Sequence, residues 1–215
     1  MHSNINYNST IIIENQYFTS INCINYLFKH SHINILLFEP YRKMSFRNRC
    51  VVAGSNGLIN LSVPVENGRD QKRVYKDVRI SYSTDWQKQH WRTLTSCYSK
   101  SAFFEFYGPG VEKFFLKKEI FLFDLNLGIL DWLKTVLRFK AEIMVMDDEL
   151  FLKEETSIVD LRDRWLPKNF QQPAEDGFDK KYFQVFESRI GFQPNLSILD
   201  LLFNEGPNAS TLFMP

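Results

Sequence analysis

The 215-residue chain lacks a dominant charge of one sign. Its 26 Lys and Arg residues nearly balance 25 Asp and Glu residues, which leaves a formal net charge of +1. No global field therefore attracts the protein to nucleic acid or to an anionic membrane, although a local basic patch is compatible with the sum. We expect no nucleic-acid partner.

Cysteine is also scarce. Cys23, Cys50 and Cys97 are odd in number, far apart and outside any CxxC pair, a pattern that disfavours a disulfide framework or a structural zinc site. The polar N-terminus lacks the features of a signal peptide, and charged residues interrupt the most apolar stretch, 119–137. These features predict a cytoplasmic protein without a transmembrane segment.

Glycine and proline are too few, at 9 and 8, for a fibrous or low-complexity chain. Glycine-rich phosphate-binding motifs and metal-ligand spacings are absent too, so the sequence predicts neither a cofactor nor a bound metal. Aromatic residues, in contrast, are abundant: 20 Phe, 9 Tyr and 4 Trp. That composition, at this length, indicates a folded chain with one large core.

The first part of the chain predicts a parallel crossover. Residues 11–13 are apolar like a short strand, residues 16–29 have helical apolar spacing, and residues 33–38 form a continuous apolar run. Two further strand-like runs, 47–53 and 58–65, flank a Gly-Ser-Asn-Gly loop that is typical of a β-hairpin. Imperfect alternation over 74–81 predicts another half-buried strand.

Helices dominate the predictions that follow. We expect a helix over 84–99 with Thr84 and Gln87 as a capping box, a break at 108–110, one or two helices over 111–138, a late strand over 141–146 and a long loop over 147–181. Short helices over 182–189 and 197–205 follow. The prediction is one α/β domain over 11–210, after a frayed segment 1–10. Its mixed sheet begins parallel and continues with antiparallel hairpin strands, and helices pack on it.

Several sequence blocks together resemble the WbqC-like family. They are NQYF at 15–18, SFRNRC at 45–50, DVRISY at 77–82, WQKQHWR at 86–92, Tyr98 with Phe103 and Phe104, FLFDLN at 121–126, and the segment 191–207. The chain departs from the family where members often have prolines after the first strand, since Thr19, Ser20 and Cys23 stand there. The family is associated with bacterial O-antigen and other surface-polysaccharide gene clusters. The resemblance therefore implies a pathway, and it assigns no catalytic residue.

A run of arginines is the first candidate site. In a strand, Arg47 and Arg49 point to one face and Asn48 to the other, so two guanidinium groups can form a fork for phosphate or carboxylate. Arg79 on a neighbouring strand would extend that substrate site. The alternative is a row of solvent-facing charges paired with carboxylates.

His90 is the second candidate. It shares a predicted helix face with Trp86 and lies beside Trp91, and an imidazole there is suited to general acid or base catalysis. The alternative is a core histidine held by one hydrogen bond.

Polar residues at strand ends form the third group. Glu39 and Tyr41 follow the buried strand, and Gln16 and Tyr17 follow the first strand, so all four are expected near one sheet edge. Glu39 is a candidate catalytic residue and the others are candidate substrate contacts. The alternative for Glu39 is a simple exit from strand to loop.

Asp200 is an acid within an apolar run and a further candidate for substrate binding. The spacing Ser197-x-x-Asp200 also fits a variant of the helix capping box, which by itself explains an acid there.

Phenylalanines interleave with Lys113, Lys117 and Lys118 between residues 103 and 123. Such a segment can contact a membrane surface or a partner protein. The alternative is a core segment with a solvated lysine edge.

Two hypotheses of function remain. The first is a cytosolic transferase-type enzyme that acts on an activated sugar or another anionic, nucleotide-linked intermediate of O-antigen-like polysaccharide biosynthesis. The second is a non-catalytic binding or assembly protein that docks to membrane-associated biosynthetic partners and exposes an aromatic patch. Convergence of Arg47, Arg49, Glu39 and His90 on one cleft would favour the enzyme.

Overall fold

The computed structural model of the chain describes residues 10–67, 73–147, 158–173 and 177–214. Residues 1–9 of the predicted frayed segment lie outside these ranges, whereas Thr10 begins the first strand. The predicted long loop lies only partly within them.

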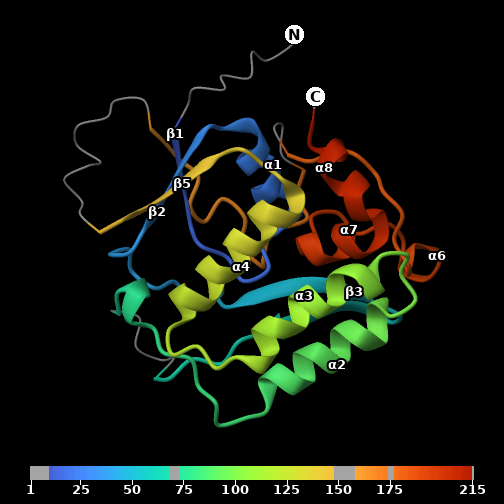
Figure 1. The fold of residues 1–215 in the computed structure, drawn as a ribbon, viewed down its shortest axis with the longest axis horizontal. Coiled ribbons are helices and arrows are strands. Elements are labelled where there is room, and N and C mark those ends of the chain that lie inside the picture. The colour runs from blue at the N-terminus through green and yellow to red at the C-terminus, as the bar shows by residue number, and fades with distance from the viewer. Residues whose placement is uncertain (1–9, 68–72, 148–157, 174–176, 215) are drawn as a thin grey trace.

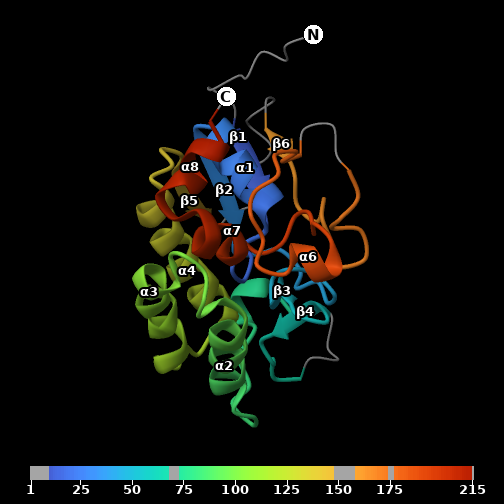
Figure 2. The same ribbon diagram turned by 90° about the vertical axis from the view of Figure 1, so that its right-hand side faces the viewer.

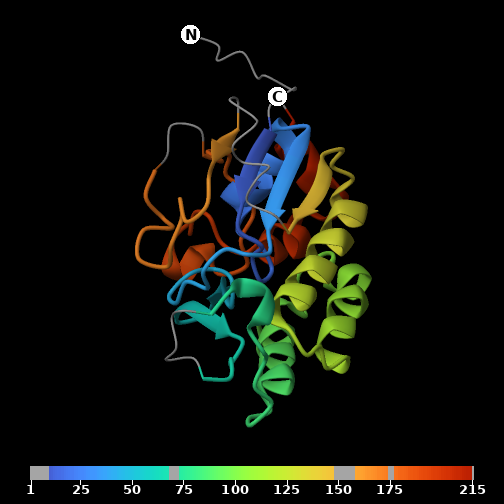
Figure 3. The same ribbon diagram turned by 90° about the vertical axis from the view of Figure 1, so that its left-hand side faces the viewer.

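A parallel sheet forms the upper half of the molecule (Figures 1 and 3). In the described chain its order is β5-β2-β1-β6, and each neighbouring pair is parallel. The strands are β1 (Thr10–Ile13), β2 (His32–Leu36), β5 (Glu142–Met146) and β6 (Val159–Asp160). Helix α1 (Ile21–Lys29) connects β1 to β2, so the predicted parallel crossover is confirmed. The short strand β6 falls where we predicted a loop.

The predicted hairpin is confirmed as a separate two-stranded sheet. Strand β3 (Arg49–Gly54) pairs antiparallel with β4 (Gly57–Ser62), and Gly57 has φ +131°, a conformation that favours glycine. The α/β class is therefore correct, but the parallel and antiparallel strands belong to two sheets. Arg47 precedes β3, so it does not share a strand with Arg49 as predicted.

Helices cover the sheet and the hairpin. Figure 2 shows α1, α7 and α8 grouped beside the parallel strands, with α2 and α3 below them and α4 rising from that level toward β5. The helices after α1 are η1 (Tyr75–Asp77), α2 (Trp86–Tyr98), α3 (Phe104–Leu116), α4 (Leu122–Leu137), α6 (Glu187–Ile190), α7 (Ile198–Glu205), η2 (Gly206–Asn208) and α8 (Ala209–Leu212). Strand β5 and helix α7 agree with the strand predicted over 141–146 and the helix predicted over 197–205.

Two local predictions of secondary structure are wrong. Residues 108–110 do not form the predicted break. Helix α3 continues through Pro109, and Val111 and Phe115, which follow Pro109, are buried. Residues 74–81 are not a strand. Tyr75 is fully buried in η1 there, and its hydroxyl donates to the Asn15 carbonyl at 2.7 Å. Tertiary contacts outweigh the weak local pattern in both segments.

The capping prediction for α2 is also wrong. Asp85 occupies the N-cap position without a side-chain cap bond, and the Gln87 amide donates to the Lys117 carbonyl at 2.7 Å. The predicted helix over 182–189 is shorter, since only α6 is helical.

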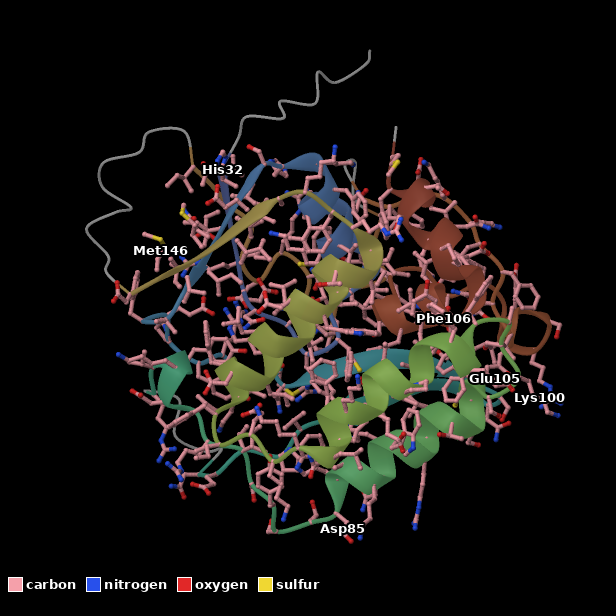
Figure 4. The ribbon with its side chains drawn as sticks, in the orientation of Figure 1. His32, Asp85, Lys100, Glu105, Phe106 and Met146 are labelled. Atoms are coloured by element: carbon pink, nitrogen blue, oxygen red, sulfur yellow. The ribbon has the colours of Figure 1, made fainter. Side chains whose placement is uncertain are left out.

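The phenylalanine-rich segment 103–123 contributes mostly to the core. Phe104, Phe115 and Phe123 are buried, whereas Phe106 is 75% exposed on α3, on the same side of the molecule as Lys100 (Figure 4). Among the described residues, no helix has the length and hydropathy needed to cross a membrane.

Two helix-interior glycines provide a matched test of the α3–α4 contact. A Cβ at Gly110 would lie 2.9 Å from Nε1 of Trp132, whereas one at Gly128 would meet Phe114 at an ordinary 3.7 Å. We expect Gly110→Ala to lower the free energy of unfolding by about 1–2 kcal/mol through overpacking. Gly128→Ala should raise it by about 0.5–1 kcal/mol through helix propensity. Urea denaturation measures the unfolding free energy of both variants. Equal effects would contradict the close approach of α3 to Trp132 at Gly110.

Candidate functional site

Acidic residues gather at the carboxyl ends of the parallel strands. Glu14 directly follows β1, and Glu39 lies three residues beyond β2. Asp160 is the last residue of β6, and Asp163 lies three residues further on. The chain adds β2 and β5 on one side of β1 and then places β6 on the other, so the strand order reverses between β1 and β6. Ligands of open α/β sheets bind outside the carboxyl ends of strands at such a reversal.

Arg47 binds these acidic loops together. Its guanidinium forms a two-pronged pair with Glu39 (Nε–Oε1 and Nη2–Oε2, both 2.9 Å), and its Nη1 donates to Oδ1 of Asp163 at 2.6 Å. Arg42 donates to the other oxygen of Asp163 at 2.9 Å, and Arg162 lies 3.4 Å from Glu39. Arg47 is only 1% exposed. It therefore acts as an internal counter-ion for loops that follow different strands.

The backbone around Arg47 is held as firmly as its side chain. Its carbonyl accepts a 2.6 Å hydrogen bond from the Asn126 amide, which also donates to the Tyr75 hydroxyl at 2.7 Å. The preceding carbonyl, of Phe46, accepts from the Tyr17 amide just after β1 at 2.9 Å. This segment is thus fixed against both β1 and α4.

The pKa values of the charged groups in this network are shifted in different directions. Burial alone would lower the pKa of Arg47, but its hydrogen bonds with Glu39 and the charges of Glu39, Glu14 and Asp163 raise that pKa above the ordinary value. Burial raises the pKa of Asp163, but Arg47 and Arg42 outweigh it and keep that pKa low. Burial raises the pKa of Glu14 despite the nearby Arg47. Its oxygens accept from the Asp163 amide at 2.8 Å and from the Gln16 side chain at 2.6 Å.

A cavity of about 580 Å³ opens above this network. Its lining residues come from the loops after β2 and β6: Glu39, Pro40, Tyr41, Arg42, Lys43, Arg47, Asp160, Arg162 and Asp163. Arginine hydrogen bonds already occupy the carboxylates, including Asp160, which accepts from Arg162 at 2.6 Å. Lys43 and the Tyr41 hydroxyl, in contrast, form no hydrogen bond or ion pair within the described part of the chain. The unused hydrogen-bonding capacity of the cavity is therefore mainly that of donors.

The structure brings together part of the predicted arginine site. Arg47 lines the cavity, while the neighbouring Asn48 is buried and donates to the Val63 carbonyl at 2.9 Å. Arg49 is half-buried at the start of β3 and is not part of the cavity lining. Arg79 is exposed, lies 3.4 Å from Glu66 and covers the Phe121 ring.

The four residues predicted at the sheet edge have different positions. Glu39 and Tyr41 line the cavity, and burial raises the pKa of Tyr41 to about 12 despite the nearby Arg49 and Arg47. Gln16 lies behind the cavity, where it connects Glu14 to the Ser20 amide. Tyr17 turns into the core.

His90 is a core residue in this structure. Its Nδ1 and the Tyr17 hydroxyl are 2.9 Å apart, and the imidazole packs edge-on against Trp86. Burial lowers the pKa of His90 to about 4, although a backbone hydrogen bond with Ser62 opposes the shift. His90 does not line the cavity that contains Glu39 and Arg47, so the predicted convergence is only partial.

Asp200 forms a second buried acidic centre. Its two oxygens accept hydrogen bonds from the hydroxyls of Tyr98 and Tyr182, both at 2.6 Å. Burial raises the pKa of Asp200 to about 6, and these bonds limit the rise. Ser197 caps α7 by accepting from the Leu199 amide, while the Asp200 carboxylate is engaged with the tyrosines. Both oxygens of Asp200 are therefore engaged inside the core.

Several residues of the cavity network are not among the predicted site residues. Glu14 directly follows the first predicted strand, so its position gave a signal equal to that of Gln16. Arg42 and Lys43 likewise follow Tyr41 in the loop after β2. Asp160, Arg162 and Asp163 gave no such signal, because they lie in a segment without apolar periodicity. Among the described residues, no cluster of three or more His, Cys, Asp or Glu side chains is suited to a metal ion.

The fold and the cavity define an α/β protein with a polar pocket at the carboxyl edge of a parallel sheet. A model of the WbqC-like protein family matches residues 16–174, and the chain belongs to this family. The chain is similar to the uncharacterized protein Rv1507c of Mycobacterium tuberculosis, with 27% identity over an alignment of 196 positions; the match covers 79% of this chain and 81% of that protein. No solved structure matches the chain.

Removing the Arg47 charge tests the internal counter-ion. Arg47→Met leaves the buried Glu39 and the half-buried Asp163 without their common partner, so we expect a loss of about 3–5 kcal/mol in unfolding free energy at pH 7. Arg162→Met, in the same network but more exposed, should cost less than about 1 kcal/mol. The Arg47→Met penalty should shrink toward pH 3, because Arg47 keeps the pKa of Asp163 low and the stability that this shift contributes is lost as the pH falls. Urea denaturation at both pH values measures this, and a pH-independent penalty would contradict the assignment.

The low pKa of His90 predicts a specific acid sensitivity. The unfolded chain protonates this imidazole near pH 6.5 and the folded chain near pH 4, so stability is complete above pH 6.5 and falls as the pH decreases. Relative to His90→Asn, the wild type should lose about 3 kcal/mol between pH 7 and pH 4. Denaturation curves and NMR titration of the ring test this, and a ring that titrates near pH 6.5 would rule it out.

Proposed function

We propose that this protein is a cytosolic transferase-type enzyme that binds an activated sugar or another anionic intermediate of surface-polysaccharide assembly. The proposed binding site is the cavity at the carboxyl edge of the parallel sheet. The association of the WbqC-like family with surface-polysaccharide gene clusters supports the pathway.

One observation carries the proposal: the cavity offers donors and positive charge, while its carboxylates are already occupied. Arg42 uses one nitrogen on Asp163, which leaves its other N–H groups available, and Lys43 contributes an ammonium group without a carboxylate partner in the described chain. Such groups bind phosphate and carboxylate well. The volume of about 580 Å³ is within the usual range for small-molecule sites.

The residues of the cavity have different proposed roles. Arg42, Lys43 and Tyr41 contact the anion. Arg47 is a positioning residue, since its own nitrogens are engaged by Glu39 and Asp163. Glu39 lines the cavity, but both of its oxygens accept from Arg47 or Arg162, so its proposed role is also to position the site, and no proton acceptor is assigned. We leave His90, Arg79 and Asp200 out of the proposed site, because none of them lines this cavity.

The non-catalytic hypothesis requires an exposed aromatic patch between residues 103 and 123. Phe106 is exposed there, and so are Leu116 and Ile120, but Phe104, Phe115 and Phe123 are in the core. This distribution gives the assembly role less support than the cavity gives the enzyme.

A ligand screen with matched variants tests the proposal. We expect one class among nucleotide sugars, acyl-CoA thioesters and other activated donors to raise the melting temperature of the wild type, because binding to the native state stabilises it. Arg42→Ala and Lys43→Ala should each weaken that ligand about tenfold in calorimetric titration, through loss of a charge-assisted hydrogen bond. Arg79→Ala, which removes an exposed arginine outside the cavity, should bind normally.

Two results would count against the proposal. If Lys43→Ala and Arg42→Ala bind that ligand with the affinity of the wild type, the ligand does not bind in this cavity. Retained binding without any transfer product in mass spectra, after incubation with candidate acceptor sugars, would favour the non-catalytic hypothesis.

A further inference from the structure

A second cavity, of about 340 Å³, lies at the opposite edge of the parallel sheet. Ser31 directly precedes β2 and Ala141 directly precedes β5, so both are at the amino ends of strands. Figure 4 labels the two edges, with His32 at the start of β2 and Met146 at the end of β5. The five residues of β2 rise about 3.3 Å each, so roughly 16 Å separates the two edges. This groove is therefore distinct from the cavity of the proposed function.

The walls of this groove are apolar and well packed. It is lined by Leu27, Phe28, His30, Ser31, Arg138, Phe139, Lys140, Ala141, Phe213 and Met214. The Phe28 ring stacks on Phe213 with centroids 4.9 Å apart and lies 5.9 Å from Phe139. Phe139 and Phe213 are buried, whereas Met214 at the mouth is 51% exposed. The groove thus offers a fixed aromatic wall with an accessible apolar entrance.

The charges at the groove are all of one sign. Arg138 and Lys140 are exposed on either side of the buried Phe139, and no Asp or Glu is among the lining residues. Neither cation forms an ion pair within the described part of the chain. Arg138 caps the carboxyl end of α4, where the helix dipole favours a positive charge. The helix dipole explains the position of Arg138, but it does not explain why Lys140 also lies beside an open apolar groove.

We propose that this groove binds an anionic amphiphile, a single hydrocarbon chain that ends in a carboxylate or a phosphate. The chain packs against Phe28, Phe139 and Phe213, and the headgroup meets Arg138 and Lys140. Aromatic walls with a few charged groups at the rim are the usual composition of small-molecule sites. This inference does not depend on the proposed transferase activity, because it concerns different residues at the other end of the sheet.

Calorimetric titration of the full chain with two homologous series tests the proposal. Hexanoate, octanoate and decanoate form one series and the corresponding alkyl phosphates the other, all below their micelle concentrations. Affinity should rise by up to about fourfold per added methylene until the chain outgrows the groove. Each acid should bind more tightly than the alcohol of equal length. The stronger of the two series identifies the headgroup.

Variants at exposed positions distinguish the contribution of the cations from that of apolar packing, and they leave the core unchanged. Arg138→Asn with Lys140→Asn should weaken decanoate or decyl phosphate several-fold and leave decanol unchanged, and asparagine tolerates the left-handed backbone at 138 (φ 58°). Met214→Glu should weaken the anions further by placing a negative charge at the mouth. Lys76→Asn with Lys100→Asn, a matched loss of two exposed cations away from the groove, should have no effect.

Three outcomes would overturn the proposal. These are equal binding of decanoate and decanol by the wild type, affinity independent of chain length, and unchanged anion binding in Met214→Glu. Sedimentation velocity supplies a further check. A dimer that decanoate dissociates would make a second copy of the chain the natural occupant of the groove, contrary to the proposal.

Discussion

The desolvated guanidinium of Arg47 is the constraint on which the candidate site depends. A cation that is 1% exposed must be neutralised, and here Glu39 and Asp163 neutralise it from loops after two different strands. These strands, β2 and β6, lie on opposite sides of β1. The ion pair therefore closes the sheet edge at the point where the strand order reverses. Such buried pairs add little net stability over apolar packing, but breaking one is costly.

This arrangement explains the chemistry that the cavity can offer. Because arginines occupy the carboxylates of Glu39, Asp160 and Asp163, the cavity presents donors to a ligand rather than acceptors. Asp200 shows another solution to the same physical problem. Two tyrosine hydroxyls satisfy its oxygens without a cation, and the carboxyl keeps a pKa of about 6 inside the core. The network of Glu39 and Asp163 lines a cavity, whereas the Asp200 network lies inside the core at α7.

Sequence periodicity predicted elements whose local signals agree with their tertiary surroundings. The crossover from β1 to β2, the β3–β4 hairpin and α7 with its Ser197 cap are such cases. Predictions were wrong where a tertiary contact outweighed a local signal, as for Pro109 inside α3 and for Tyr75 in η1. The two residues of β6 show no period, so only their pairing with β1 defines them as a strand.

The sequence by itself determined the α/β class and the family, because apolar spacing and the combined sequence blocks depend on residue order alone. It also indicated Glu39, Tyr41 and Arg47, which line the cavity of the proposed site. Tertiary structure decided which partners those residues contact. Arg47 is an internal counter-ion rather than an open anion fork, because folding brings Asp163, 116 residues away in the chain, to its guanidinium. It also placed His90 in the core: the Trp86 contact follows from helix spacing, but the contact with Tyr17, 73 residues away, depends on packing that no local pattern encodes.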